Sequence, residues 1–173
     1  MKKVLVVVDM QNDFLSGALG SPEAEKIIPN VKDLIKDFKG EVIFTRDTHG
    51  EDYLSTREGR HLPVPHCTRG SRGWQITDEL ETLGRRIFDK STFGSVHLAK
   101  YLAEINERAG LESVTLVGVC TDICVISNAM LIKAYLPEVD VIVDASCCAG
   151  VSRESHENAL SAMRACQIEV VNA

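Results

Sequence analysis

Short apolar runs alternate along this chain with segments whose apolar residues recur at helical spacing. Apolar runs of this length are typical of strands buried on both faces of a parallel sheet. The segments between them carry one apolar face, and Ser21 followed by Pro22 marks the start of the first predicted helix. The pattern predicts strands at residues 3–8, 41–45, 86–88, 114–117, 139–143 and 168–171, and helices at residues 22–38, 95–109, 123–133 and 153–165.

This alternation predicts an α/β fold with an open, mainly parallel six-stranded sheet and helices on both of its faces. No repeat, linker or low-complexity stretch interrupts the sequence, so we expect a single domain over residues 1–173. Residues 47–75 depart from the rhythm, because they are rich in His, Gly, Pro and Arg and follow neither period. A loop of that length in a compact domain is usually functional.

Composition narrows the classes of function. Hydrophobic residues make up 45% and charged residues 25% of the chain, which is typical of soluble globular proteins. The net charge of −6 argues against nucleic acid or a membrane as a partner, and no apolar run is long enough to span a bilayer. The first apolar run ends at Asp9 and is too short for a signal peptide. Six cysteines at this length predict reduced thiols in a cytoplasmic protein.

Three chemically active residues follow the carboxyl ends of predicted strands, where open parallel sheets place ligands. Cys124 follows a strand that breaks at Gly118 and opens a predicted helix, whose free N–H groups and dipole favour a thiolate. Asp9 could accept the thiol proton, and Lys90 could stabilise both negative charges. Taken singly, they have plainer interpretations as a packed cysteine, a loop-capping carboxylate and a solvated lysine. Together they suit amide hydrolysis.

The motifs around these residues, DMQNDF, DKSTFGS and GVCTDICV, resemble those of the isochorismatase-like cysteine hydrolase superfamily. The resemblance extends over nearly the whole chain and implies that Asp9, Lys90 and Cys124 form a catalytic triad. It also implies a cis peptide bond between Val119 and Cys120, with the N–H groups of Cys120 and Cys124 forming an oxyanion hole.

The long segment 47–75 supplies candidate metal ligands. Asp47 and His49 lie on one side of an extended segment, which suits them to chelate a divalent ion, and His66 is preceded by prolines. The fourth ligand could be Glu58 or His61. The set resembles that of nicotinamidases, which hold zinc or iron beside the cysteine. This resemblance favours Glu58, by its spacing from His49, and zinc over iron or manganese. Isochorismatases proper lack these ligands.

The resemblance to nicotinamidases implies hydrolysis of nicotinamide to nicotinate and ammonia through a cysteine thioester, in pyridine nucleotide biosynthesis. Phe14 and Phe93 would form an aromatic wall for the pyridine ring, and Val119 would also contact the substrate. Pro63 stands where nicotinamidases often have an aromatic residue, and Trp74 is a candidate to replace it from farther along the loop. The expected partner is a small-molecule amide, and the resemblance also implies a homo-oligomer.

Two other functions stay open. A metal-poor member of the superfamily would hydrolyse carbamoyl or ureido amides, and a non-catalytic member would keep the fold as a binding module. A bound divalent metal would argue against the first, and the presence of all three triad residues argues against the second. The remaining polar residues have plain interpretations: Asp122 stabilises a helix N-terminus, and His156 lies on a helix surface.

Overall fold

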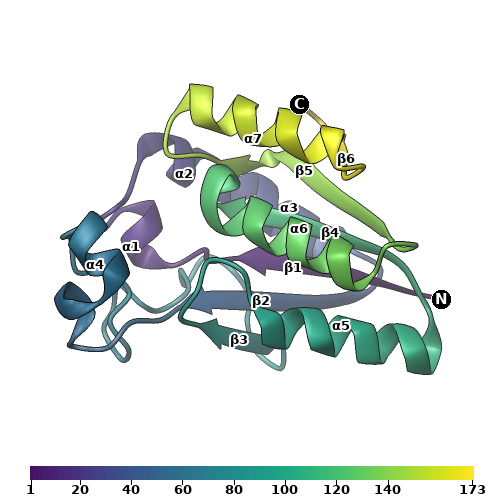
Figure 1. Ribbon diagram of the computed structural model, residues 1–173, viewed down its shortest axis with the longest axis horizontal. Coiled ribbons are helices and arrows are strands. Elements are labelled where there is room, and N and C mark those ends of the chain that lie inside the picture. The colour runs from purple at the N-terminus through teal and green to yellow at the C-terminus, as the bar shows by residue number, and fades with distance from the viewer.

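Six parallel strands form one open sheet in the computed structural model, which describes residues 1–173 (Figure 1). The strand order is β3-β2-β1-β4-β5-β6, and every neighbouring pair is parallel, which confirms the predicted fold class. The chain builds outward from β1 in one direction and then from β4 in the other. The strands are β1 (Lys2–Val8), β2 (Glu41–Asp47), β3 (Arg86–Lys90), β4 (Leu111–Val119), β5 (Asp140–Ala149) and β6 (Glu169–Val171).

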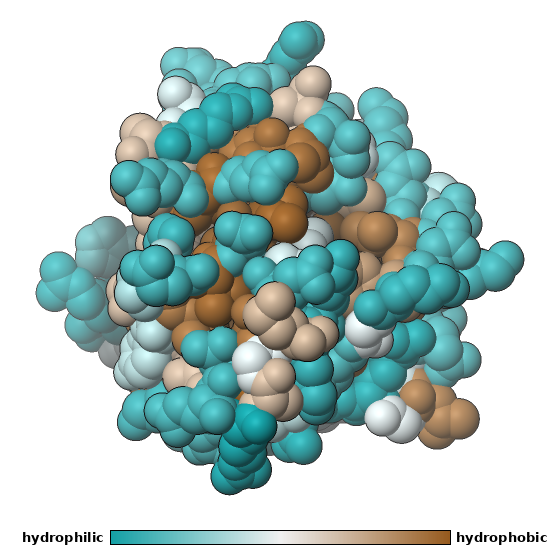
Figure 2. Space-filling view, turned by 90° about the vertical axis from the view of Figure 1, so that its right-hand side faces the viewer, coloured by the Kyte–Doolittle hydropathy of each residue, from teal (hydrophilic) through white to brown (hydrophobic).

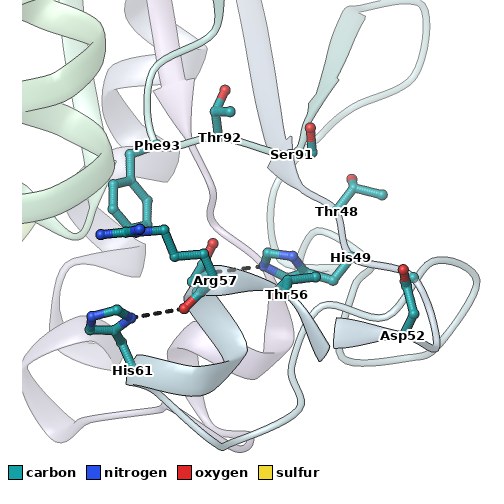
Figure 3. A pocket seen from close by; sticks show the side chains of 11 residues that line it. Thr48, His49, Asp52, Thr56, Arg57, His61, Ser91, Thr92 and Phe93 are labelled. Carbon is teal, nitrogen blue, oxygen red and sulfur yellow. Dashed lines mark hydrogen bonds and ion pairs between the residues drawn. The ribbon is translucent and has the colours of Figure 1, made fainter. Parts of the chain in front are cut away.

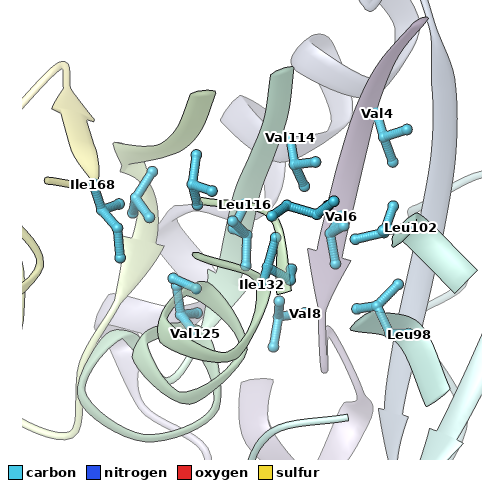
Figure 4. Close-up of a cluster of buried hydrophobic side chains, with 14 of the residues drawn as sticks. Val4, Val6, Val8, Leu98, Leu102, Val114, Leu116, Val125, Ile132 and Ile168 are labelled. Atoms are coloured by element: carbon cyan, nitrogen blue, oxygen red, sulfur yellow. The ribbon is translucent and has the colours of Figure 1, made fainter. Parts of the chain in front are cut away.

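Helices cover both faces of the sheet, because successive residues of the central strand point to opposite sides. Val6 and Val8 of β1 belong to the larger core cluster and lie beside Leu98 and Leu102 (Figure 4). Leu5 and Val7 of β1 belong to the second core cluster, on the other face of the sheet. The larger cluster includes residues of α5 (Val96–Ala109), α6 (Ile126–Tyr135) and α7 (Arg153–Ala165), and the second includes residues of α1 (Asn12–Leu15), α2 (Pro22–Lys26) and α3 (Ile28–Asp37).

The helix predicted over residues 22–38 is divided in two. Ser21 caps α2 as expected, because its side chain accepts a hydrogen bond from the Ala24 N–H. The chain then starts again as α3, with Pro29 in the first turn. Proline has no N–H to donate and its ring clashes with the preceding turn, so it fits the start of a helix better than its interior.

β4 continues past the glycine at which the strand was predicted to break. Gly118 has φ +114°, and a Cβ atom there would lie 2.1 Å from the carbonyl oxygen of Val8 on β1. Only glycine allows this backbone angle and this close approach of the two central strands. Beyond Val119 a cis peptide bond leads to Cys120, as the resemblance implied, and a π-helical turn at Thr121–Val125 leads into α6.

The carboxyl ends of four adjacent strands carry the candidate site residues. Asp9 follows β1, Asp47 ends β2, Lys90 ends β3, and Cys120 follows β4. The strand order reverses between β1 and β4, and ligands bind at such a point in open α/β sheets. The loop that carries α4 (Arg57–His61) lies at this edge with α1 (Figure 1). Figure 2 shows the opposite, amino-end face, where hydrophilic residues surround smaller apolar patches. None of the helices has the length and apolar character needed to cross a membrane.

Candidate active site

A buried amine joins the candidate base to the candidate nucleophile. The Nζ atom of Lys90 lies 2.7 Å from Oδ2 of Asp9 and donates a hydrogen bond to Sγ of Cys124 at 3.3 Å. None of the three residues is more than 5% exposed. The structure therefore brings together three residues that are separated by more than thirty positions in the sequence at each step.

Asp9 keeps one carboxylate oxygen available for proton transfer. Its backbone is left-handed, with φ +49°, and its Oδ1 atom accepts a hydrogen bond from Thr45 Oγ1 at 2.7 Å. Its Oδ2 atom is buried and makes only the ion pair with Lys90, with no aligned hydrogen bond. Burial raises the pKa of Asp9, and the charge of Lys90 opposes that shift. Oδ2 is thus the oxygen able to accept the proton of the thiol.

Cys124 lies in the π-helical turn that follows the cis peptide bond. The carbonyl oxygen of Cys120 accepts hydrogen bonds from the N–H groups of Ile123 at 3.1 Å and Val125 at 3.0 Å. The N–H of Cys124 is not the donor in either of these two bonds. The Asn128 side chain fixes the turn from the following helix by donating to the Cys124 carbonyl oxygen at 2.8 Å.

Burial opposes the effect of the helix N-terminus, which was expected to favour a thiolate at Cys124. Burial raises the pKa of Cys124 well above its ordinary value, the charge of Asp9 raises it further, and Lys90 only partly opposes this. Sequence reasoning counted the helix dipole but could not count desolvation by residues from other elements. The resting group is therefore a thiol, which needs a base to become a nucleophile.

Four side chains of the long segment form a compact set of metal-ligating groups. One ligand atom from each of Asp47, His49, Glu58 and His66 lies within 4.8 Å of the others. Oδ2 of Asp47 lies 2.9 Å from Nε2 of His49 and 3.6 Å from Nε2 of His66. Glu58 Oε1 lies 3.7 Å and 3.9 Å from the same two nitrogens. Two imidazoles and two carboxylates converging in this way fit a divalent transition metal such as zinc.

Hydrogen bonds around the set place the ligand atoms. Nδ1 of His66 lies 2.8 Å from the Val64 carbonyl oxygen, and with a proton on that nitrogen it leaves Nε2 free as a ligand. Burial acts to raise the pKa of Asp47, but hydrogen bonds from both histidines and the charge of Lys90 hold it below its ordinary value, so the carboxylate stays ionised. His61 is exposed, with Nδ1 2.8 Å from the Arg57 carbonyl oxygen, and lies outside the set.

The triad and the metal-ligating set are in contact through the carboxylate of Asp47. Oδ1 of Asp47 lies 3.5 Å from Nζ of Lys90, on the side away from the histidines. Both groups open onto a cavity of about 530 Å³ at the switch point. Most of its lining residues are hydrophobic, among them Phe14 and Phe93, and Cys124 and three of the four metal-ligating residues also line it. A thiol and a candidate metal centre therefore face the same space.

Two predicted contributors to the cavity lie elsewhere. Val119 is 1% exposed and packs in the second core cluster, so it does not line the cavity. Trp74 donates from Nε1 to Oγ1 of Thr48 at 2.8 Å, and Arg46 stacks on its ring with 3.5 Å to the centroid. It is absent from the lining, so it does not replace the aromatic residue missing at Pro63.

A second, more polar hollow of about 730 Å³ lies against the outer side of the metal-ligating set (Figure 3). Figure 3 shows His49, Arg57 and Thr92 around it, with the ring of Phe93 at its edge. Glu58, His61 and Phe93 line both hollows and form the wall between them.

Sequence reasoning missed several polar residues that support the site. His156 was expected on a helix surface, but its Nδ1 atom lies 2.8 Å from Oγ1 of the buried Thr121, next to the cis peptide. Asp122 lies in the first turn of its helix, and its Oδ1 atom also accepts a hydrogen bond from the Val151 N–H at 3.0 Å. Gln11 is fully buried against Asp47. Each partner is distant in sequence, so no local pattern could have indicated these contacts.

Comparisons with known proteins agree with this geometry. The family model described as Isochorismatase domain matches residues 3–173. A nicotinamidase of Schizosaccharomyces pombe is 28% identical, over 97% of this chain and 92% of its own. An uncharacterized isochorismatase family protein of Bacillus subtilis is 30% identical over 93% of both chains. The solved structure of a pyrazinamidase of Pyrococcus horikoshii in complex with zinc is 32% identical, with complete coverage of both chains and a TM-score of 0.85.

Proposed function

This chain belongs to the isochorismatase family, and we propose on that basis that it is a nicotinamidase, which hydrolyses nicotinamide to nicotinate and ammonia. Its family and its similarity to nicotinamidases make it a hydrolase that acts on amide C–N bonds. The lining of the cavity supports nicotinamide as its amide substrate.

One observation supports nicotinamide above other amides: the Cys124 thiol and three of the four metal-ligating residues, Asp47, Glu58 and His66, line the same cavity. A pyridine carboxamide has a carbonyl carbon for a nucleophile and, on the same ring, a nitrogen lone pair for a metal. The largely apolar lining, with Phe14 and Phe93, suits the flat ring between those two ends. An amide without a ring nitrogen would use only half of this site.

In the first half of the reaction, Oδ2 of Asp9 takes the proton of the Cys124 thiol, and the thiolate attacks the carboxamide carbon. Lys90 stabilises the thiolate and keeps Asp9 paired throughout. The N–H groups of Cys120 and Cys124 bind the oxyanion of the tetrahedral intermediate. The C–N bond then breaks, and the nitrogen takes the proton from Asp9 and leaves as ammonia.

In the second half, a water molecule cleaves the thioester. Asp9 is again a carboxylate, and it accepts a proton from the attacking water. The same two N–H groups stabilise the second tetrahedral intermediate. When the C–S bond breaks, the sulfur recovers its proton from Asp9, and the acid product releases its own proton to solvent and leaves as a carboxylate.

Asp47, His49, Glu58 and His66 would hold the divalent metal, with zinc as the first candidate and iron or manganese as alternatives. When bound, such an ion would supply Lewis acidity toward the ring nitrogen of the substrate. The chain's own part is to keep Asp47 ionised and both Nε2 atoms directed at the same point.

Ammonia release from a panel of amides tests the proposal. We expect purified enzyme to hydrolyse nicotinamide and pyrazinamide, to act poorly on benzamide, which lacks the ring nitrogen, and to lose activity after chelation. Cys124→Ala should release no ammonia, and Cys124→Ser should keep the fold without restoring the rate. Activity in Cys124→Ala would refute the mechanism. Turnover confined to a carbamoyl or ureido amide, unaffected by chelator, would refute the substrate.

A further inference from the structure

The polar run Gln11-Asn12-Asp13, which begins two residues after Asp9, has no part in the mechanism above. All three side chains turn toward the loop 47–75. Gln11 is fully buried, and its Oε1 atom accepts a hydrogen bond from the Asp47 N–H at 2.7 Å. Its Nε2 atom donates to the Asp47 carbonyl oxygen at 2.8 Å and to the Trp74 carbonyl oxygen at 2.8 Å.

The reason for this pairing lies in the sheet. β1 and β2 pair in register up to Val7 and Phe44, and Asp9, with its left-handed backbone, makes the last backbone bond to β2, at Thr45. Beyond that point β1 no longer lies beside β2. The N–H and C=O of Asp47 therefore have no strand partner on the β1 side of β2, although β3 still pairs with the other side. Buried backbone groups need partners. The primary amide of Gln11 takes the place of the missing peptide group.

Asp13 binds the other end of the loop. Its Oδ2 atom accepts a hydrogen bond at 2.7 Å from the N–H of Cys67, the residue after His66. Cys67 has a left-handed backbone, with φ +45°, and its carbonyl oxygen accepts the His49 N–H at 3.0 Å. The peptide units of Cys67 thus connect two of the metal-ligating residues. Gly73 packs so closely that a Cβ atom there would lie 2.1 Å from Asp13 Oδ2.

We propose that Gln11 and Asp13 are positioning residues of the metal centre, which fix Asp47 directly and fix His49 and His66 through Cys67. This inference rests on the proposed metal site. The contacts are to backbone groups of the ligands or of their neighbour, so they set where each ligand side chain begins. Outer contacts of this kind govern the affinity of metal sites.

Asn12 is the internal control. Its Nδ2 atom donates to the carbonyl oxygen of Arg72, in the same loop but away from the four metal-ligating residues in sequence. It is a clamp of the same type, from the same segment to the same loop. If the run only held the loop in place, all three side chains would matter alike for metal binding.

The test is metal affinity, measured on full-length protein freed of metal with a chelator. Gln11→Met and Asp13→Ala should weaken zinc and cobalt binding by about 10- to 100-fold, the usual cost of losing an outer contact. Both should also change the visible absorption spectrum of the cobalt form, which reports ligand geometry. Asp13→Asn should recover the affinity, because its amide oxygen can still accept the Cys67 N–H. Asn12→Ala should stay within about twofold of the original affinity.

A second readout separates positioning from general damage. The rate at which iodoacetamide modifies Cys124 in metal-free protein should be the same in all variants, because the sheet and not the loop holds the triad. Wild-type affinity and spectrum in Gln11→Met and Asp13→Ala would overturn the inference, as would a matching loss in Asn12→Ala or a change in alkylation rate. If Gln11→Met fails to fold, the two Asp13 variants decide. An unsubstituted protein that binds no zinc or cobalt would instead refute the metal site itself.

Discussion

The triad and the metal-ligating set share one cavity, yet the chain builds them in different ways. Asp9, Lys90 and Cys124 come from three distant segments, two at strand ends and one in the turn after β4, and all are buried. The metal-ligating set comes from the end of β2 and the loop that follows it, and its Glu58 side chain is 26% exposed. The first group is fixed by packing within the sheet, and the second by hydrogen bonds to a loop.

Because of this difference, we expect that a substitution can disturb the triad or the metal-ligating set without disturbing the other. Displacing a triad residue requires movement of a strand end or of the buried turn after β4, whereas displacing a residue of the metal-ligating set requires only that a loop lose its contacts. The exception is the contact between Lys90 and Asp47, where the two groups meet. Substitutions on either side of that contact, and at it, therefore test whether the distinction holds.

The largest effect is expected at the contact itself. Lys90→Met removes the cation that faces Asp9, Asp47 and the Cys124 sulfur, and leaves two carboxylates buried without it. Breaking a buried ion pair from one side costs about 3–5 kcal/mol, so the free energy of unfolding in urea should fall by that amount. Ammonia release should drop about a thousandfold or more, as for other members of a catalytic unit.

The matched control for this substitution is Lys100→Met in α5, since that lysine is exposed and makes no ion pair. Its stability and activity should be unchanged. Should Lys90→Met keep its stability, the carboxylates of Asp9 and Asp47 would not both be charged in the folded protein.

The next effect is confined to the metal-ligating set. Glu58→Gln weakens one ligand and should reduce zinc affinity by about 10- to 100-fold, the scale on which disturbed metal sites respond. His61→Ala changes a residue of the same short helix that lies outside the set, so its affinity should be unchanged. Zinc competition with a chromophoric chelator measures both. Equal losses in the two variants would show that His61 ligates together with Glu58, whereas the sequence alternative had His61 in place of Glu58.

Cys124 alkylation in metal-free Glu58→Gln provides the complementary measurement. If the two groups are independent, the rate should equal that of the metal-free original protein. A changed alkylation rate would show that the loop affects the thiol, and that the triad and the metal-ligating set are not independent.

The sheet and its active edge could be predicted from the sequence for a physical reason. Buried strands and helices have different hydrophobic periods, and parallel strands bring their carboxyl ends to one edge. Asp9 and Lys90 were visible because each directly follows or ends such a strand. The metal-ligating residues were visible because they are close in sequence, and the choice between Glu58 and His61 needed only the course of one short helix.

What the sequence could not supply depends on contacts between distant segments. The direction of Val119 into the core follows from the register of β4, which no local pattern defines. The raised pKa of Cys124 comes first from burial by other elements. The role of Gln11 depends on where β1 and β2 part, and a polar residue after a strand gives no indication of that.

A smaller effect is expected within the triad, from the hydroxyl beside its base. Thr45 Oγ1 donates to Asp9 and so lowers the pKa of a carboxyl group that burial has raised. Asp9 must be ionised to accept the thiol proton, so activity falls as pH decreases through its pKa. Thr45→Val removes the hydrogen bond and raises that pKa, which should move the acid limb of kcat/KM to higher pH and lower the rate several-fold on that limb.

Thr45→Ser keeps a hydroxyl at the same place and should restore the original pH profile. Zinc affinity should be unchanged in both variants, because Thr45 contacts none of the metal-ligating side chains. An unmoved acid limb in Thr45→Val would mean that a group other than Asp9 controls it.

The smallest effect is expected at Trp74, which lies in the loop but contacts neither group. Trp74→Phe keeps a ring beneath the Arg46 guanidinium and removes only the hydrogen bond from Nε1 to Thr48. A hydrogen bond of this kind contributes about 1 kcal/mol, so the midpoint of urea unfolding should shift slightly. The KM for nicotinamide should stay the same, whereas Phe14→Leu, in the cavity lining, should raise it. A raised KM in Trp74→Phe would mean that the indole reaches the substrate after all, and that the loop takes part in binding beyond its metal ligands.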